Sequence, residues 1–216
     1  MTGSALQKIS EAECLRTEEQ SPFKREDVDG FVYALHGEDT PNAQAGALSR
    51  HGLIGTNLIA ALHRPALRQG SKVYASDMRV RIQARGARYD YPDVVLTCED
   101  MADDARDASS PCFIVEVLSQ STQVVDRGQN LSEYTALPSL QGYLMVDTAT
   151  RAARLYTRQG EGWGEQYVEE AGVLRLPCVD VELTLDDVYE GTSLQPPHTP
   201  QPASTPTAPK HGLQAK

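Results

Sequence analysis

Two short aliphatic runs, each marked by a single carboxylate, are the clearest feature of the hydrophobic pattern. They predict strands from Val94 to Thr97 and from Phe113 to Leu118, because both are rich in Val, Ile and Leu and too short for helices. Asp93 directly precedes the first strand, and Glu116 lies inside the second. A charge in an apolar strand is costly unless it has a partner. These two carboxylates are therefore the first candidates for a functional site.

Periodicity predicts further elements on both sides of these strands. Apolar residues at three- and four-residue steps predict a helix over residues 47–69, which Pro65 should kink or end early. Alternating apolar and basic residues predict one strand over residues 72–83. The other expected elements are a helical segment within 1–20, a hairpin around Asp29–Gly30, a helix from residues 119–122 to about 137, a strand over 141–146, an edge hairpin of 153–157 and 165–169, a strand over 173–176 and a helix over 185–189.

This order of elements predicts an α/β fold, with a mixed central sheet flanked by helices. The 216 residues are enough for one well-buried domain. We expect an N-terminal helical arm over residues 1–20 and a single domain over 21–192. Residues 193–216 are rich in Pro and Thr, and such a composition predicts a disordered tail.

The net charge of −10 argues against tight, non-specific binding of nucleic acid. It leaves room for a nuclease with a local basic strip, and Arg79 and Arg81, on one face of the strand expected over 72–83, are candidates for phosphate binding. The alternative is that they form a solvated strand face or pair with Glu116. The sequence shows neither an apolar run long enough to span a membrane nor a secretory signal, which predicts a cytoplasmic protein without a membrane partner.

The two carboxylates could share a metal ion. Adjacent strands lie about 4.8 Å apart, so inward-facing Asp93 and Glu116 on neighbouring strands would be close enough. Carboxylates without thiolates favour Mg²⁺ or Mn²⁺, and such an ion lowers the pKa of a bound water and stabilises charge on a scissile phosphate. The alternative is that Asp93 only opens a strand and Glu116 forms an ion pair with Arg79 or Arg81.

Four segments in this order, YPDVVLTC, PCFIVEVLSQST, DRGQNLSEY and LPSLQGYLMVD, resemble the Uma-type family of restriction endonucleases, within the PD-(D/E)xK nuclease superfamily. The resemblance covers about residues 26–189. It implies a restriction-endonuclease-like core that hydrolyses phosphodiester bonds in DNA, with Asp93 and Glu116 as ligands of Mg²⁺ or Mn²⁺. Because related nucleases often pair to cut both strands, the resemblance also implies a homodimer.

The resemblance extends to residues around the implied site. Glu26 matches a family glutamate near the site, although it could be a solvated hairpin residue. His51 matches a helix histidine, but a lone His on an apolar stripe is more often part of a core. The family lysine is replaced here by Asn130, which can hydrogen-bond water or phosphate without adding charge. The implied catalytic residues are Asp93, Glu116 and Asn130, with Gln129 and Arg127 as neighbours that could orient water or phosphate.

Three functions remain open from the sequence. The first is a Mg²⁺-dependent DNA endonuclease. The second is a catalytically impaired nuclease fold that serves as a binding or assembly module, a hypothesis motivated by Asn130 and the acidic net charge. The third is a metal-dependent hydrolase of a small phosphorylated substrate, which a small acidic protein would suit better than a long duplex.

Overall fold

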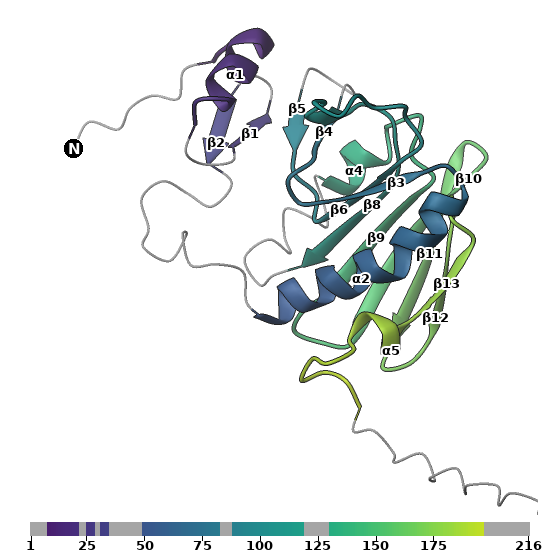
Figure 1. The fold of residues 1–216 in the computed structure, drawn as a ribbon. Helices are drawn as coiled ribbons and strands as arrows, with labels where there is room; N and C mark the ends of the chain where they lie inside the picture. Colours follow the sequence, from purple (N-terminus) through teal and green to yellow (C-terminus); the bar gives the residue numbers. More distant parts are fainter. Residues whose placement is uncertain are drawn as a thin grey trace, which may run out of the picture.

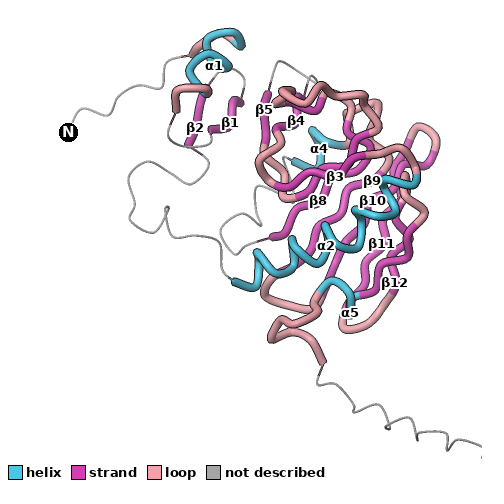
Figure 2. The backbone as a smooth tube through the Cα atoms, in the orientation of Figure 1, coloured by secondary structure: helices cyan, strands magenta, loops and turns pink. Residues whose placement is uncertain are grey.

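The computed structural model of the chain describes residues 8–21, 25–28, 31–34, 49–82, 88–118 and 130–196. A six-stranded sheet and a five-stranded sheet form its framework (Figure 1). The tube in Figure 2 shows helix α2 (Ser49–Arg68) running across the strands of the larger sheet. The sheet contains parallel and antiparallel pairs, so the predicted α/β fold with a mixed sheet is confirmed.

The six-stranded sheet has the order β11-β10-β9-β8-β6-β3. Inside it, β8 (Pro111–Leu118) is antiparallel to β6 (Val94–Thr97) and parallel to β9 (Gly142–Asp147). All eight residues of β8 are buried, which explains its nearly continuous apolar sequence. The other strands of this sheet are β3 (Lys72–Ala75), β10 (Ala152–Gln159) and β11 (Gly162–Glu169).

Helix α2 covers one face of the larger sheet with its apolar stripe. Ile54, Leu58 and Leu62 are fully buried in one core cluster with alternate residues of β6 and β8, among them Val94 and Val115. The helix continues through Pro65 to Arg68, so an early end at Pro65 was wrong. Ala66, directly after the proline, is fully buried, so the helix still packs on the sheet beyond Pro65.

The other face of the larger sheet packs against a second core cluster, which joins it to the smaller sheet and to helix α4 (Leu131–Tyr134). In this cluster, Ile114 and Leu118 of β8 pack with Val80 and Ile82 of the smaller sheet. Tyr134 of α4 belongs to the same cluster. The smaller sheet has the order β2-β1-β5-β4-β7. Its strands are β1 (Arg25–Val28), β2 (Phe31–Ala34), β4 (Arg79–Ile82), β5 (Arg88–Asp90) and β7 (Asp107–Ala108).

The single strand predicted over residues 72–83 was wrong, because the chain turns between Ala75 and Arg79. The amide of Met78 donates to the carbonyl of Ala75 at 3.1 Å and closes this turn. As a result, β3 pairs with β6 in the larger sheet, whereas β4 pairs with β5 in the smaller one. Ser76 and Asp77 are turn-forming residues, which the longer alternation of apolar and polar positions concealed.

The expected N-terminal helix is α1 (Glu11–Glu18), and its N-cap Ser10 accepts a hydrogen bond from the amide of Glu13. The expected hairpin is the antiparallel pair β1 and β2. Of the helix predicted to run to about residue 137, residues 119–129 lie outside the described part, and α4 with its following turn is what the structure describes.

The C-terminal part confirms the expected hairpin β10–β11, the expected strand β12 (Val173–Leu176) and the expected helix α5 (Leu185–Val188). It adds β13 (Val181–Thr184), which was not predicted and pairs with β12. The guanidinium of Arg158 on β10 donates to the carbonyls of Leu137 and Leu140 at 2.7 Å each. It also lies over the ring of Trp163 on β11, 4.6 Å from the centroid. The outer hairpin thereby holds the segment that follows α4. Within the described ranges, no helix is long and apolar enough to cross a membrane.

Candidate active site

Asp93 lies immediately before β6 and is held by a neighbouring strand and by helix α2. Its Oδ2 accepts a hydrogen bond from the amide of Val117 at 2.7 Å, and Val117 directly follows Glu116 on β8. The same oxygen is 3.5 Å from Nε2 of His51 on α2. The structure therefore ties the carboxylate of Asp93 to the backbone beside Glu116 and to an imidazole.

His51 is partly buried, and its environment favours the protonated form. The hydrogen bond to Asp93 raises the pKa of His51 above its usual value, against the opposing effect of burial; the charge of Asp93 and the backbone of Val117 add to the increase. The expectation that His51 is only a core residue of the apolar stripe was incomplete, because it contacts a predicted site residue.

Glu116 is 9% exposed and contacts the one tyrosine of α4. Its Oε1 lies 3.1 Å from the hydroxyl of Tyr134, which also donates to Oδ2 of Asp90 at 2.6 Å. Burial raises the pKa of Tyr134 well above its usual value, and the charges of Asp90 and Glu116 add to the effect. The hydroxyl therefore keeps its proton, and two buried carboxylates compete for that single donor.

Arg88 brings a positive charge to Asn130. Its Nη2 donates to Oδ1 of Asn130 at 3.0 Å and lies 3.4 Å from Oδ2 of Asp90, while Nη1 pairs with Glu133. The side chain of Arg88 is 7% exposed and Asn130 is also buried. The polar cluster of Arg88, Asp90, Glu116, Asn130 and Tyr134 thus lies between the two sheets, where β5 and β8 meet α4.

Comparison with known protein families identifies the family of this chain. Residues 14–186 match the model of the Uma2 family, described as "Putative restriction endonuclease". The chain belongs to this family. It is 30% identical over 191 residues to the uncharacterised protein slr1290 of Synechocystis sp., covering 85% of this chain and 93% of that one. It is 31% identical over 156 residues to sll1609 of the same organism, covering 71% and 82%.

A solved structure shares the fold of this Uma2 chain. It is a protein from Anabaena variabilis described as "a putative nuclease belonging to DUF820", with a TM-score of 0.61. The superposition covers 81% of this chain and 96% of that protein, at 14% identity. The match supports the restriction-endonuclease-like fold predicted from the sequence.

In this Uma2 chain, Asp93 and Glu116 stand on neighbouring strands, but their side chains meet different partners. By continuation of the pairing of Val94 with Val115, the two residues are opposite each other. Asp93 contacts His51 of α2, whereas Glu116 contacts Tyr134 of α4. Among the described residues, no group of three or more His, Cys, Asp or Glu side chains is arranged to hold a metal.

Arg79 and Arg81 are both engaged by carboxylates away from Glu116. Nε of Arg79 is 2.6 Å from Asp107, and Nη2 of Arg81 is 2.6 Å from Glu11 of α1. Glu26 lies on β1 opposite Tyr33, and its side chain is outside the described part of the structure. Gln129 and Arg127 also lie outside the described residues.

Sequence reasoning missed Arg88, Asp90 and Tyr134. Arg88 and Asp90 are two positions apart in a strand and so share one face, which the sequence RYDYPD could have indicated. Both are nearly fully buried, and buried charges at strand spacing signal a polar cluster. No local signal identifies Tyr134 as their partner.

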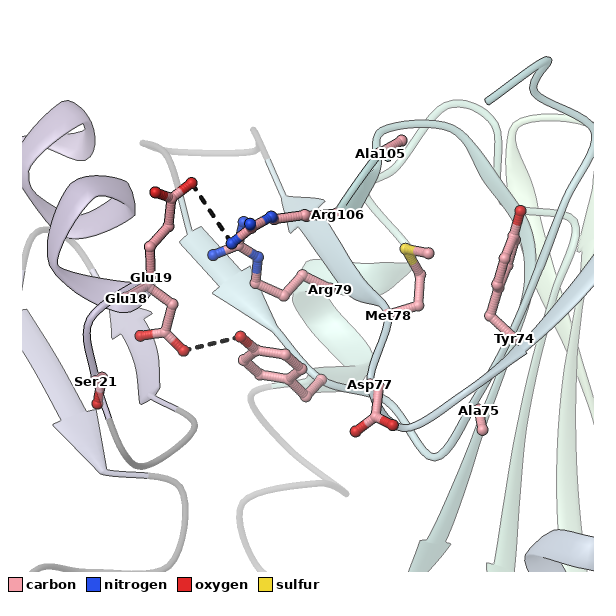
Figure 3. Close-up of a pocket in the computed structure, with 11 residues that line it drawn as sticks. Glu18, Glu19, Ser21, Tyr74, Ala75, Asp77, Met78, Arg79, Ala105 and Arg106 are labelled. Carbon is pink, nitrogen blue, oxygen red and sulfur yellow. Dashed lines mark hydrogen bonds and ion pairs between the residues drawn. The ribbon is translucent and has the colours of Figure 1, made fainter. Parts of the chain in front are cut away.

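A cavity of about 570 Å³ lies apart from these carboxylates (Figure 3). It is bounded by the end of α1, the turn between β3 and β4, and the loop before β7, and its lining includes Glu18, Glu19, Arg79 and Arg106. Asp93 and Glu116 are not among its lining residues. This cavity and the predicted chemistry are thus in different places.

Proposed function

We propose that this protein is a Mg²⁺-dependent endonuclease that hydrolyses phosphodiester bonds in DNA in the cytoplasm, with Asp93 and Glu116 holding the ion. One observation carries the proposal: Asp93 is hydrogen-bonded to the residue after buried Glu116, at the two positions that match the family's acidic motif. The hydroxyl of Tyr134 is one hydrogen-bonding partner of buried Glu116, and a bound cation would compensate its charge.

The donor set fits a hard divalent ion. Both residues offer carboxylate oxygens, the ligands that Mg²⁺ and Mn²⁺ prefer. Mg²⁺ is commonly held by one or two carboxylates and keeps several waters, so a third protein ligand is not required. When bound, the ion would supply a water of lowered pKa and neutralise charge on the phosphate.

The surrounding side chains would orient these groups. Tyr134 fixes the carboxylate of Glu116, and His51 holds that of Asp93 as long as the imidazole carries its proton. Asn130 and Arg88 together provide an amide beside a guanidinium, which could orient a water or bind a phosphate oxygen. In this proposal Gln129 or Arg127 adds to that group.

The test is cleavage of supercoiled plasmid by the purified chain with Mg²⁺, with Mn²⁺ or with EDTA. We expect cleavage that requires the metal and falls at least a hundredfold in Asp93→Asn and in Glu116→Gln. Asp104→Asn makes the same chemical change in an exposed loop and should cleave like the native chain. Cleavage that persists in Asp93→Asn would refute the assignment. We also propose that the protein forms a homodimer, as related nucleases that cut both strands do, and light scattering would test this.

The engagement of Asn130 by Arg88 favours a second candidate, an impaired nuclease fold that binds DNA or assembles with a partner. This candidate predicts no cleavage by the native chain with either metal, and measurable cleavage by Asn130→Lys. Efficient native turnover would exclude it. Comparing plasmid, oligonucleotide and dinucleotide substrates in the same assay separates a DNA endonuclease from a hydrolase of small phosphorylated compounds.

A further inference from the structure

The outer face of the smaller sheet carries arginine and tyrosine side chains. On β4, Val80 and Ile82 face the second core cluster, which leaves Arg79 and Arg81 on the opposite face. Tyr89 on β5 is opposite Arg81 in the pairing, and the guanidinium of Arg79 lies 5.3 Å from the centroid of its ring. Arg106, from the loop before β7, adds a third guanidinium, which is 63% exposed.

Helix α1 lies on this face and contacts it through carboxylates. Oε1 of Glu11 is 2.6 Å from Nη2 of Arg81 and accepts from the hydroxyl of Tyr89 at 2.8 Å. The hydrogen bond from Tyr89, together with Arg81, holds the pKa of Glu11 below its usual value, so that it is ionised at neutral pH. The carboxylate of Glu11 therefore occupies the place that an anionic ligand of this arginine would take.

The end of the helix makes the same kind of contact at the cavity of Figure 3. Oε1 of Glu18 accepts from the hydroxyl of Tyr91 at 2.8 Å, and Oε1 of Glu19 is 3.5 Å from Nη1 of Arg106. Three carboxylates of one helical segment thus face two arginines and two tyrosine hydroxyls.

Apolar packing contributes little to this attachment. Cys14 is the buried residue of α1, and within the described ranges neither core cluster includes a residue of α1. Glu18 makes a stronger contact, because its Oε2 lies 2.8 Å from Nε of Arg25 on β1 and both side chains are largely buried. The ion pairs of Glu11 and Glu19 are more exposed, and such pairs contribute little stability and are screened by salt. The helix can therefore be displaced by a ligand that offers more anionic groups to the same arginines.

We propose that this outer face is a binding surface for single-stranded DNA, and that α1 covers it as an acidic substitute for the phosphates. The inference rests on the proposed function in taking DNA as the ligand. Arginine pairs with phosphate oxygens, and the partly exposed Tyr91 at the cavity offers a ring on which a base can stack, which is the combination that strand-binding surfaces use. The cavity of about 570 Å³ between α1 and this face has the volume of a small-ligand pocket, enough for a nucleotide unit.

The experiment uses the full chain and measures binding of a fluorescein-labelled oligothymidylate by anisotropy, in EDTA so that no cleavage occurs. The variant Glu11→Gln/Glu18→Gln/Glu19→Gln removes the three negative charges that face the surface. We expect it to bind the oligonucleotide about tenfold more tightly than the native chain, since each displaced charge competes with phosphate. Glu13→Gln is the matched control, because Glu13 pairs with Arg16 within the helix.

Adding Arg81→Gln and Arg106→Gln to the triple variant should abolish the gain. The dependence of log affinity on log salt should become shallower by about 1.4, as expected for two lost phosphate contacts on a single strand. Amide hydrogen exchange within residues 11–18 of the native chain should accelerate when the oligonucleotide is added. Circular dichroism of each variant checks that the fold is retained.

The surface assignment is overturned if the triple variant binds no more tightly than Glu13→Gln, or if the two arginine changes leave affinity and salt slope unaltered. A mononucleotide that competes as well as the oligonucleotide would also overturn it. If the oligonucleotide binds at this face but no metal-dependent cleavage occurs, the binding surface is supported and the nuclease proposal is refuted. If cleavage occurs without such binding, the nuclease proposal is supported and the binding surface is refuted.

Discussion

Nε2 of His51 lies 3.5 Å from Oδ2 of Asp93, so helix α2 and the start of β6 are joined by a contact that depends on protonation. Asp93 raises the pKa of His51, so the folded state holds the proton more tightly than the unfolded state. The resulting stability is fully present below the ordinary histidine pKa of about 6.5 and is lost as pH rises through the folded value.

The first prediction concerns the stability of His51→Gln. Near pH 5.5 we expect this variant to be less stable than the native chain by about 1 kcal/mol, the contribution of one partly exposed hydrogen bond. The difference should shrink toward pH 9. Urea unfolding at both pH values measures it, with His63→Gln, an exposed histidine of the same helix, as the control. An equal difference at both pH values would refute the His51–Asp93 linkage.

The second prediction concerns metal binding. If Asp93 and Glu116 hold the ion, Mn²⁺ at a hundredfold excess over its dissociation constant should stabilise the folded chain by about 2.7 kcal/mol, a rise in melting temperature of roughly 5–10 °C. Asp93→Asn and Glu116→Gln should lose this shift. Because protonated His51 competes for Asp93, the shift should grow with pH in the native chain and vary less in His51→Gln. A full shift in Asp93→Asn would contradict the prediction.

The third prediction concerns the hydroxyl of Tyr134. Tyr134→Phe leaves Asp90 and Glu116 without a shared donor in a buried place, and we expect a loss of about 1–3 kcal/mol at neutral pH. Tyr156→Phe removes a hydroxyl from a half-buried ring of β10 and serves as the control. Thermal melts at neutral pH would show whether Tyr134→Phe loses more stability than Tyr156→Phe, and equal losses would contradict the prediction.

The fourth prediction concerns Arg88. Arg88→Met removes the cation that faces Glu133 and Asp90 and should destabilise the fold by about 3–5 kcal/mol, because it leaves buried negative charge. Adding Asp90→Asn should recover part of the loss. If the double variant is no more stable than the single one, Arg88 does not act by compensating that charge.

The fifth prediction concerns Gly142 at the start of β9. A Cβ there would lie 2.6 Å from the ring of Phe113 and from Pro177, so Gly142→Ala should cost about 1–3 kcal/mol. Gly52→Ala offers the matched change, because a Cβ at this helical position meets no atom within 4 Å. It should stabilise the chain by about 0.5–1 kcal/mol. Urea unfolding of both variants gives the comparison.

The elements that the sequence predicts well are those whose signal is local. The strand from Val94 to Thr97 was predicted with the bounds that the structure gives, since a short, fully buried strand is a continuous apolar run. Glu116 was identifiable because a carboxylate interrupts such a run. Asp93 was identifiable because it precedes one directly.

The partners of these residues depend on topology and were not predictable. Tyr134 reaches Glu116 because the crossover from β8 to the parallel strand β9 carries α4 across the sheet, and nothing in the local sequence encodes that placement. The ion pair between Arg81 and Glu11 likewise joins segments 70 positions apart. The division of residues 72–83 between two sheets was also not predictable. Apolar and polar residues alternate in the same way whichever sheet a strand joins.

The hydrogen bonds that Arg158 donates to the segment after α4 link the polar cluster around Glu116 to the outer hairpin. The donors of Arg158 fix the loop that begins one residue after Tyr134, and its own position is set by the outer hairpin and Trp163. The orientation of Glu116 is thus coupled to an edge of the molecule that touches none of the carboxylates. Transplanting only the central strands into another scaffold would leave Tyr134 unsupported, and the acids with it.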